Sequence, residues 1–121
     1  MHEYALAKPD AVPEYTFAWD AMLYRLQGKI FALLLCNAAH GTLLNLKCDP
    51  YLSLVFRERH PAVVMPGWHM NKLHWISLIL QGSPSEPLCK ELLDISYSLV
   101  KAKLPRKRNK KSPGTVLEPE W

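Results

Sequence analysis

The sequence lacks long hydrophobic runs and has few cysteines. These two features argue against a membrane-spanning protein and against a protein held together by disulfides or zinc. Its longest apolar run, residues 30–36, is only as long as a strand, whereas a membrane-spanning helix needs roughly 18 residues. Residues 1–10 contain neither a basic nor an apolar segment, so no signal peptide is expected. Cys36, Cys48 and Cys89 form no C-x-x-C pair, which argues against a disulfide framework and a zinc ribbon. We expect a cytoplasmic protein without a membrane partner, whose cysteines are small buried residues.

The sequence also lacks a recognisable catalytic or metal-binding arrangement. No serine or cysteine lies in a nucleophile turn, and no pair of carboxylates stands beside the histidines. Because a nucleophile needs a base and a group that orients the base, we expect a protein that is not an enzyme. His69 and His74 could be joined by His60 or a cysteine, but zinc sites use three or four ligands at recognisable spacing. We therefore expect no metal and no cofactor.

The size and composition of the chain fit one ordinary globular domain. Its 121 residues are 49% hydrophobic and 10% aromatic, which is enough for a core and excludes global disorder. The net charge of +4 is unevenly spread, because residues 1–100 contain eight basic and nine acidic residues. Residues 101–121 contain seven basic and two acidic residues. Affinity for duplex DNA scales with the number of phosphates that are neutralised. The positive charge that could bind DNA therefore lies mainly at the C-terminal end of the chain, not over the whole domain.

Apolar and alternating segments separated by short turns predict an antiparallel sheet. The expected strands are residues 19–27, 29–36, 42–48 and 74–80. Asp49 and Pro50 predict the N-cap and first residue of a helix that ends near residue 60. A second helix is expected over residues 86–103. Its apolar stripe, predicted to cross the sheet, consists of Leu88, Leu92, Ile95, Leu99 and Ala102.

These elements predict an α+β fold, an antiparallel sheet with helices packed on one face. Residues 1–104 should form a single domain, and residues 105–121 a basic tail that lacks periodicity and is expected to be disordered.

Three segments occur in the order and spacing of a known family. The sequences LKCDP (residues 46–50), HPAVVMPGWHMNKLHW (residues 60–75) and ELLDISYSLVKAKLP (residues 91–105) resemble the MmcQ/YjbR-like family. The similarity extends over roughly residues 7–107. It implies a fold like that of frataxin and CyaY, and DNA binding through a double wing motif. Frataxin's iron function is not implied, because this sequence lacks an acidic ridge.

The segment PGWHMNKLHW, residues 66–75, has two interpretations. In the architectural one, a turn at Gly67 lets Trp68 and Met70 fill a gap at the sheet edge. Asn71 would then hydrogen-bond the backbone of the irregular loop, as Asx residues often do.

In the second interpretation, the same segment contacts a polyanion. Lys72 is its only fixed positive charge, and an exposed tryptophan face would be available for stacking. The basic C-terminus is either a solvated tail or a nonspecific nucleic-acid arm. The expected partner is DNA, bound with low sequence specificity; the alternative is a protein–protein adaptor that uses the same loop. The candidate nucleic-acid-binding residues are His69, Asn71, Lys72, His74, Lys101, Lys103, Arg106, Lys107 and Arg108.

Overall fold

A single antiparallel sheet organises the chain. The computed structural model describes residues 1–104, so the tail expected to be disordered, with Arg106, Lys107 and Arg108, lies outside the described residues. Six strands form the sheet in the order β1-β2-β3-β4-β6-β5, and all neighbours are antiparallel. The strands are β1 (Ala11–Thr16), β2 (Ala21–Leu26), β3 (Lys29–Asn37), β4 (Gly41–Lys47), β5 (Val64–Pro66) and β6 (Trp75–Ile79).

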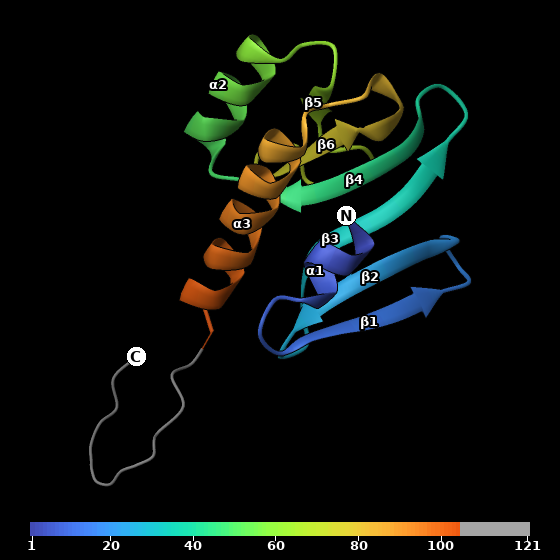
Figure 1. Cartoon of the computed structure of the whole chain (residues 1–121), viewed down its shortest axis with the longest axis vertical. Helices are drawn as coiled ribbons and strands as arrows, with labels where there is room; N and C mark the ends of the chain where they lie inside the picture. Colours follow the sequence, from blue (N-terminus) through green and yellow to red (C-terminus); the bar gives the residue numbers. More distant parts are fainter. Residues whose placement is uncertain (105–121) are drawn as a thin grey trace, which may run out of the picture.

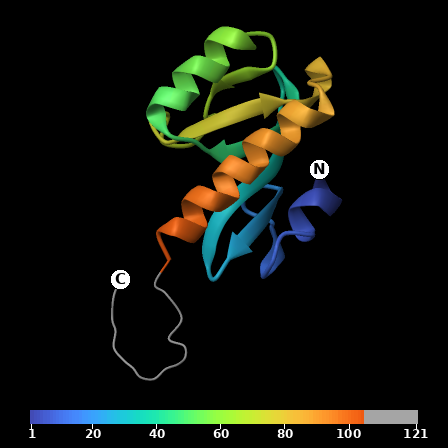
Figure 2. The same cartoon turned by 60° about the vertical axis from the view of Figure 1, so that its left-hand side comes forward.

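The helices cover one face of this sheet. They are α1 (His2–Leu6), α2 (Pro50–Arg59) and α3 (Glu86–Ala102), and a short 3-10 helix, η1 (Leu80–Gly82), follows β6. In Figures 1 and 2 the three α-helices lie on the same side of the sheet, with α3 between α1 and α2. Buried residues of all three helices join the main core, whereas the buried residues of a second cluster come from strands alone. The predicted α+β fold is confirmed.

Two strands, β1 and β5, are absent from the sequence prediction. They form the two edges of the sheet, and most residues of β1 are exposed, so β1 shows no alternation of apolar and polar residues. Each carries a proline, Pro13 or Pro66, which an edge strand tolerates and which hinders pairing with a further strand. The predicted strand over residues 19–27 begins later, at Ala21, because residues 17–20 form the turn from β1.

Both predicted helix starts and the predicted Asp49 cap are confirmed, and the structure adds a second cap at Ser85. The Asp49 carboxylate accepts hydrogen bonds from the backbone N–H groups of Tyr51 (3.0 Å) and Leu52 (3.2 Å). The Ser85 hydroxyl accepts one from the N–H of Leu88 at 3.3 Å. These bonds satisfy donors that the first turn of a helix otherwise leaves unpaired.

The buried face of α3 is rotated from the predicted stripe. Leu88 and Leu92 are buried as expected, but Ile95 and Leu99 are only half-buried and Ala102 is exposed. The buried face continues instead through Cys89, Leu93, Ser96, Tyr97 and Val100.

Ser96 and Tyr97 can be buried because the sheet and the N-terminal segment supply partners for their hydroxyl groups. The Ser96 hydroxyl donates to the carbonyl of Phe31 in β3 and accepts from the N–H of Lys47 in β4 (2.9 Å). The Tyr97 hydroxyl donates to the carbonyl of Pro9 at 2.7 Å. The predicted stripe includes neither residue, so it places the buried face of α3 incorrectly.

A polar anchor holds α1 against α3. The Tyr4 hydroxyl donates to both carboxylate oxygens of Asp94 (2.8 and 3.0 Å), and the ammonium group of Lys8 forms an ion pair with the same carboxylate. Burial by itself would raise the pKa of Asp94, but hydrogen bonds from Lys8 and Tyr4 outweigh it and hold the pKa below its ordinary value.

We expect Asp94→Asn to lower the free energy of unfolding at neutral pH by about 0.5–1.5 kcal/mol, because half-exposed anchors are screened by solvent. A carboxyl group with a lowered pKa stabilises the fold above its unfolded pKa, and this contribution is lost as the pH falls through the folded pKa. The difference between the two proteins should therefore shrink as the pH falls through this lowered pKa. Urea titrations at neutral pH and near pH 3 measure it, and a difference that persists unchanged in acid would contradict the assignment.

No helix within residues 1–104 combines the length and the apolar character needed to cross a membrane.

Candidate functional site

The loop of residues 67–74, called the site loop here, connects β5 to β6 and is held at both ends by the backbone. The Gly67 N–H donates to the carbonyl of Trp75 (2.9 Å), and the Cys48 N–H donates to the carbonyl of His74 (2.9 Å). A Cβ atom at position 67 would lie 2.6 Å from the Cβ atom of Trp75, closer than packed side chains approach. Glycine is therefore required where the loop leaves the sheet.

A buried polar clamp fixes the start of the loop at Trp68. Asn45 of β4 and Ser77 of β6 are both 0% exposed, on the face of the sheet away from the helices. The side-chain amide of Asn45 donates to the Trp68 carbonyl (3.0 Å), and the Ser77 hydroxyl accepts from the Trp68 N–H (2.8 Å) and donates to Asn45 (2.5 Å). Both backbone groups of Trp68 are thus bonded to the sheet.

The architectural interpretation of the segment is confirmed for several residues. Trp68 and Met70 are half-buried and pack against the second core cluster. The Asn71 side-chain oxygen accepts from the N–H of Leu73 at 2.9 Å, an Asx bond within the loop. The ammonium group of Lys72 donates to the carbonyl of Gly67 at 2.9 Å, so the lysine that the sequence singles out also stabilises the loop.

A first cavity, called the aromatic cavity, opens on one side of the site loop. Its volume is about 430 Å³. His69 has φ of 62°, a left-handed conformation that is uncommon outside glycine, and its ring lies 3.9 Å from that of Trp68. The cavity is lined by Ala18, Trp19, Leu33, Leu35, Trp68, His69 and Met70.

A second cavity, called the cationic cavity, opens where the loop rejoins the sheet, and its volume is about 440 Å³. Three of the predicted residues, Asn71, His74 and Lys103, meet here, and Lys47 of β4 joins them. The cavity therefore collects groups from β4, from the site loop and from the end of α3. Its charged, polar and aromatic lining residues are Lys47, Asp49, Asn71, His74, Trp75 and Lys103.

Lys47 dominates the electrostatics of the cationic cavity. Its ammonium nitrogen lies 5.6 Å from the centre of the Trp75 ring, and no carboxylate of residues 1–104 forms an ion pair with it. Partial burial, followed by repulsion from Lys103 and Lys29, lowers the pKa of Lys47 below its ordinary value. The one carboxylate in the lining, Asp49, already accepts two N–H groups at the start of α2. An anion in this cavity would relieve the repulsion between the lysines.

The histidines and cysteines of the described chain are dispersed. His69 and His74 line different cavities, and the ring of His60 stacks on Phe56 at 6.5 Å. Across residues 1–104, no three metal-ligating side chains of histidine, cysteine, aspartate or glutamate lie together.

The expectation that all three cysteines are buried is wrong for Cys36, which is exposed at the end of β3, where the strand leaves the core. Cys48 and Cys89 are buried as expected. Burial, with a contribution from Asp49, raises the pKa of the Cys48 thiol to about 11. This thiol therefore stays protonated at neutral pH and is a poor nucleophile, although it lines the cationic cavity.

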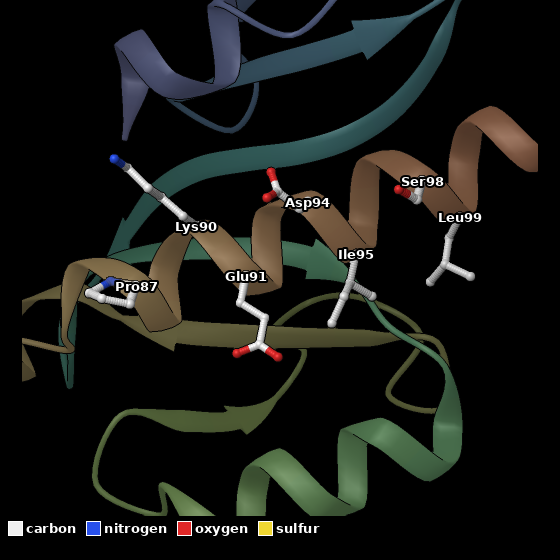
Figure 3. Close-up of a pocket in the computed structure, with 7 residues that line it drawn as sticks. All are labelled: Pro87, Lys90, Glu91, Asp94, Ile95, Ser98 and Leu99. Carbon is white, nitrogen blue, oxygen red and sulfur yellow. The ribbon is translucent and has the colours of Figure 1, made fainter.

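The outer side of α3 carries a shallow third groove, shown in Figure 3. Asp94 on this groove is held by Tyr4 and Lys8, and the ammonium group of Lys90 is 3.0 Å from the carboxylate of Glu86. Glu91 also lines it, so its acidic groups outnumber its basic ones. This groove is less suited to a polyanion than the cationic cavity.

Sequence reasoning overlooks two residues of these cavities, Lys47 and Trp19. Lys47 is an isolated lysine at the end of a strand in the sequence. It becomes a candidate site residue only because the fold places it in the same cavity as Lys103 and His74. The sequence pattern places Trp19 at the start of a strand, yet it lies on an exposed turn, where 57% of it is accessible. Lys101, another predicted site residue, is exposed in the last turn of α3 and lines none of the three cavities.

The chain is similar to several known proteins. A model of the YjbR family matches residues 6–99. Protein YbdF of Escherichia coli O157:H7 is 34% identical over 105 residues, covering 83% of this chain and 84% of YbdF. Protein YjbR of Escherichia coli K12 is 30% identical over 108 residues, covering 89% of this chain and 90% of YjbR. Both relatives are uncharacterized proteins, so the similarity to them indicates no activity for this chain.

Two solved structures share the fold. The crystal structure of protein DR2400 of Deinococcus radiodurans aligns with a TM-score of 0.75 at 28% identity, covering 84% of this chain and 76% of that chain. The crystal structure of a protein from Pseudomonas syringae aligns with a TM-score of 0.68 at 27% identity, covering 80% of this chain and 92% of that chain.

Proposed function

The chain belongs to the YjbR family, and from this premise we propose that it is a DNA-binding protein without enzymatic activity. In this proposal it contacts the phosphate backbone through the site loop and through the basic C-terminus. The observation that carries the proposal is the cationic cavity, where Lys47, Lys103, His74 and Asn71 converge.

The chemistry of the cavity suits a phosphate group. Two ammonium groups supply charge, and the Asn71 amide and the His74 ring supply hydrogen-bond donors. Phosphate contacts of this type fix the position of a protein on DNA but carry little sequence information. Low sequence specificity is therefore part of the proposal.

The position of the cavity supports a joint contact with the C-terminus. Lys103 lies at the end of α3 and lines the cavity, and the basic residues Arg106, Lys107 and Arg108 begin three residues after it in the sequence. A duplex seated against Lys103 would thus meet the densest positive charge of the chain within a few residues. The body of residues 1–100 has a net charge of −1, so attraction over a distance depends on this end.

We expect Lys47→Gln to weaken binding to duplex DNA about tenfold at low salt, the equivalent of roughly 1.4 kcal/mol for one charge-assisted contact. The slope of log affinity against log salt should become shallower by about 0.9, the value for one phosphate. Lys72→Gln should change both quantities less, because the Lys72 ammonium group is already bonded to the Gly67 carbonyl. Fluorescence anisotropy with a labelled duplex at two salt concentrations measures the affinities.

Lys90→Gln is the matched control, since it removes the same charge from the outer side of α3, away from the cavity. If Lys47→Gln and Lys90→Gln weaken binding equally, the effect is one of net charge and the cavity holds no phosphate. If the unsubstituted protein does not bind DNA at low salt, the proposal is wrong and the adaptor interpretation replaces it.

A further inference from the structure

We propose that the aromatic cavity holds an unpaired nucleobase, so that the preferred partner is single-stranded DNA. This inference rests on the proposed function and specifies the form of DNA that is bound. The cavity has a volume of about 430 Å³, inside the range of roughly 300–1,000 Å³ that is typical of small-molecule sites. Its lining is almost entirely apolar, which suits the flat faces of a nucleobase.

Two indole rings from distant parts of the sequence border the cavity. Trp19 comes from the turn between β1 and β2, and Trp68 comes from the site loop. Trp19 is 57% exposed, an unusual position for so large an apolar side chain on a short turn. Bases stack on exposed aromatic rings whatever their identity, and each stacked base strengthens binding about fivefold to a hundredfold.

The second tryptophan is rigidly placed. The backbone of Trp68 is bonded to Asn45 and Ser77, and its ring lies against the ring of His69. A fixed ring loses little conformational entropy when a base stacks on it. The cavity is thus preorganised on the side of the site loop.

The neighbouring cationic cavity points to a nucleotide rather than to an apolar side chain of a protein partner. His69 lines the aromatic cavity and Asn71 lines the cationic one, and only one residue separates them. Their Cα atoms are therefore at most about 7.6 Å apart, two trans peptide units. A nucleotide joins a base to a phosphate, the two groups that the linings of these cavities suit, whereas an apolar side chain would leave the lysines without a partner.

Single-stranded DNA follows because a base inside a duplex is already stacked on both faces and paired along its Watson–Crick edge. The acidic residue of the turn, Asp20, accepts a hydrogen bond from the Tyr15 hydroxyl and does not line the aromatic cavity. No carboxylate of the described residues therefore faces the base. Phosphates on either side of the base would meet the site loop and the end of α3.

The test compares three ligands of equal length on the full chain: oligothymidine, an abasic oligonucleotide with the same phosphates, and a duplex. We expect oligothymidine to bind at least tenfold more tightly than the abasic strand. Trp19→Ala should remove most of this difference and change duplex affinity less than twofold. Trp19→Phe should retain most of it, and Tyr51→Ala, which removes an exposed aromatic ring from α2, should have no effect. Thermal unfolding of each variant checks that the turn still folds.

Equal binding of oligothymidine and the abasic strand would overturn this inference and leave the phosphate contact of the proposed function intact. That is also the result expected if the cavity serves an apolar side chain of a protein. An undiminished preference for oligothymidine in Trp19→Ala would equally overturn it. Failure of all three ligands to bind would overturn the proposed function itself.

Discussion

Removal of residues 105–121 is expected to reduce affinity for duplex DNA at low salt by roughly a hundredfold or more. The deletion takes away five basic residues, namely Arg106, Lys107, Arg108, Lys110 and Lys111, and leaves residues 1–104 with a net charge of +1. If each basic side chain neutralises one phosphate, the slope of log affinity against log salt becomes shallower by about 4.5. Titration of a labelled duplex at several salt concentrations measures both effects.

The control keeps the length of the chain and replaces the same five residues with glutamine. It should behave like the deletion if charge is what matters. Both proteins should fold, because Leu104 packs against the core and residues 1–104 contain all the described helices and strands. If the shortened protein binds as tightly as the full chain, the body carries the whole site and the charge argument fails.

Asn45→Ala is expected to lower the free energy of unfolding by about 2–4 kcal/mol, the largest effect on stability among the substitutions considered. Asn45 is 0% exposed and bonds both the Trp68 carbonyl and the Ser77 hydroxyl. Its removal leaves the Trp68 carbonyl without this donor and the proton of the Ser77 hydroxyl without an acceptor, and each lost bond costs roughly 1–3 kcal/mol. The melting temperature should fall on the order of 10–20 °C, as differential scanning calorimetry would show.

Asn37→Ala is the matched control for this substitution. The Asn37 side chain accepts one hydrogen bond from the His40 N–H (2.6 Å) in an exposed turn, where water can replace it. We expect a loss of no more than about 1 kcal/mol. A melting temperature of Asn45→Ala equal to that of Asn37→Ala would show that the buried clamp contributes little.

The clamp also connects stability with binding. The backbone of Trp68 is bonded by the clamp, and the same residue lines the aromatic cavity. Loosening the clamp should therefore weaken the preference for single strands more than the contact with phosphates. Lys47 and Lys103 do not bond to Asn45, and the cationic cavity keeps both lysines in Asn45→Ala. The two cavities are thus predicted to respond differently to one buried substitution.

Much of the fold follows from local features of the sequence. Asp49 with Pro50, and Ser85 with Pro87, specify where α2 and α3 begin, because capping involves residues within one helical turn. The strands β3, β4 and β6 are recognised from short apolar segments between turns. The family is recognised from the site loop and its flanking motifs. The uneven distribution of charge along the chain follows directly from the positions of its basic and acidic residues. All of these are properties of neighbouring residues.

Long-range packing decided the rest. Ser96 and Tyr97 are buried because Phe31, Lys47 and Pro9 offer partners for their hydroxyl groups, which no helical period reveals. The edge strand β1 exists because it pairs with β2, although its own residues are mostly exposed.

The candidate site depends on the tertiary structure most of all. Lys47 meets Lys103 and His74 because β4 pairs with β6 and α3 ends beside both strands. Trp19 meets Trp68 because the turn after β1 and the site loop border the same face of the sheet. The sequence by itself determined which residue types were available, and strand order and register determined which of them converge. Register is a non-local property, set by the pairing of segments that local propensity treats independently.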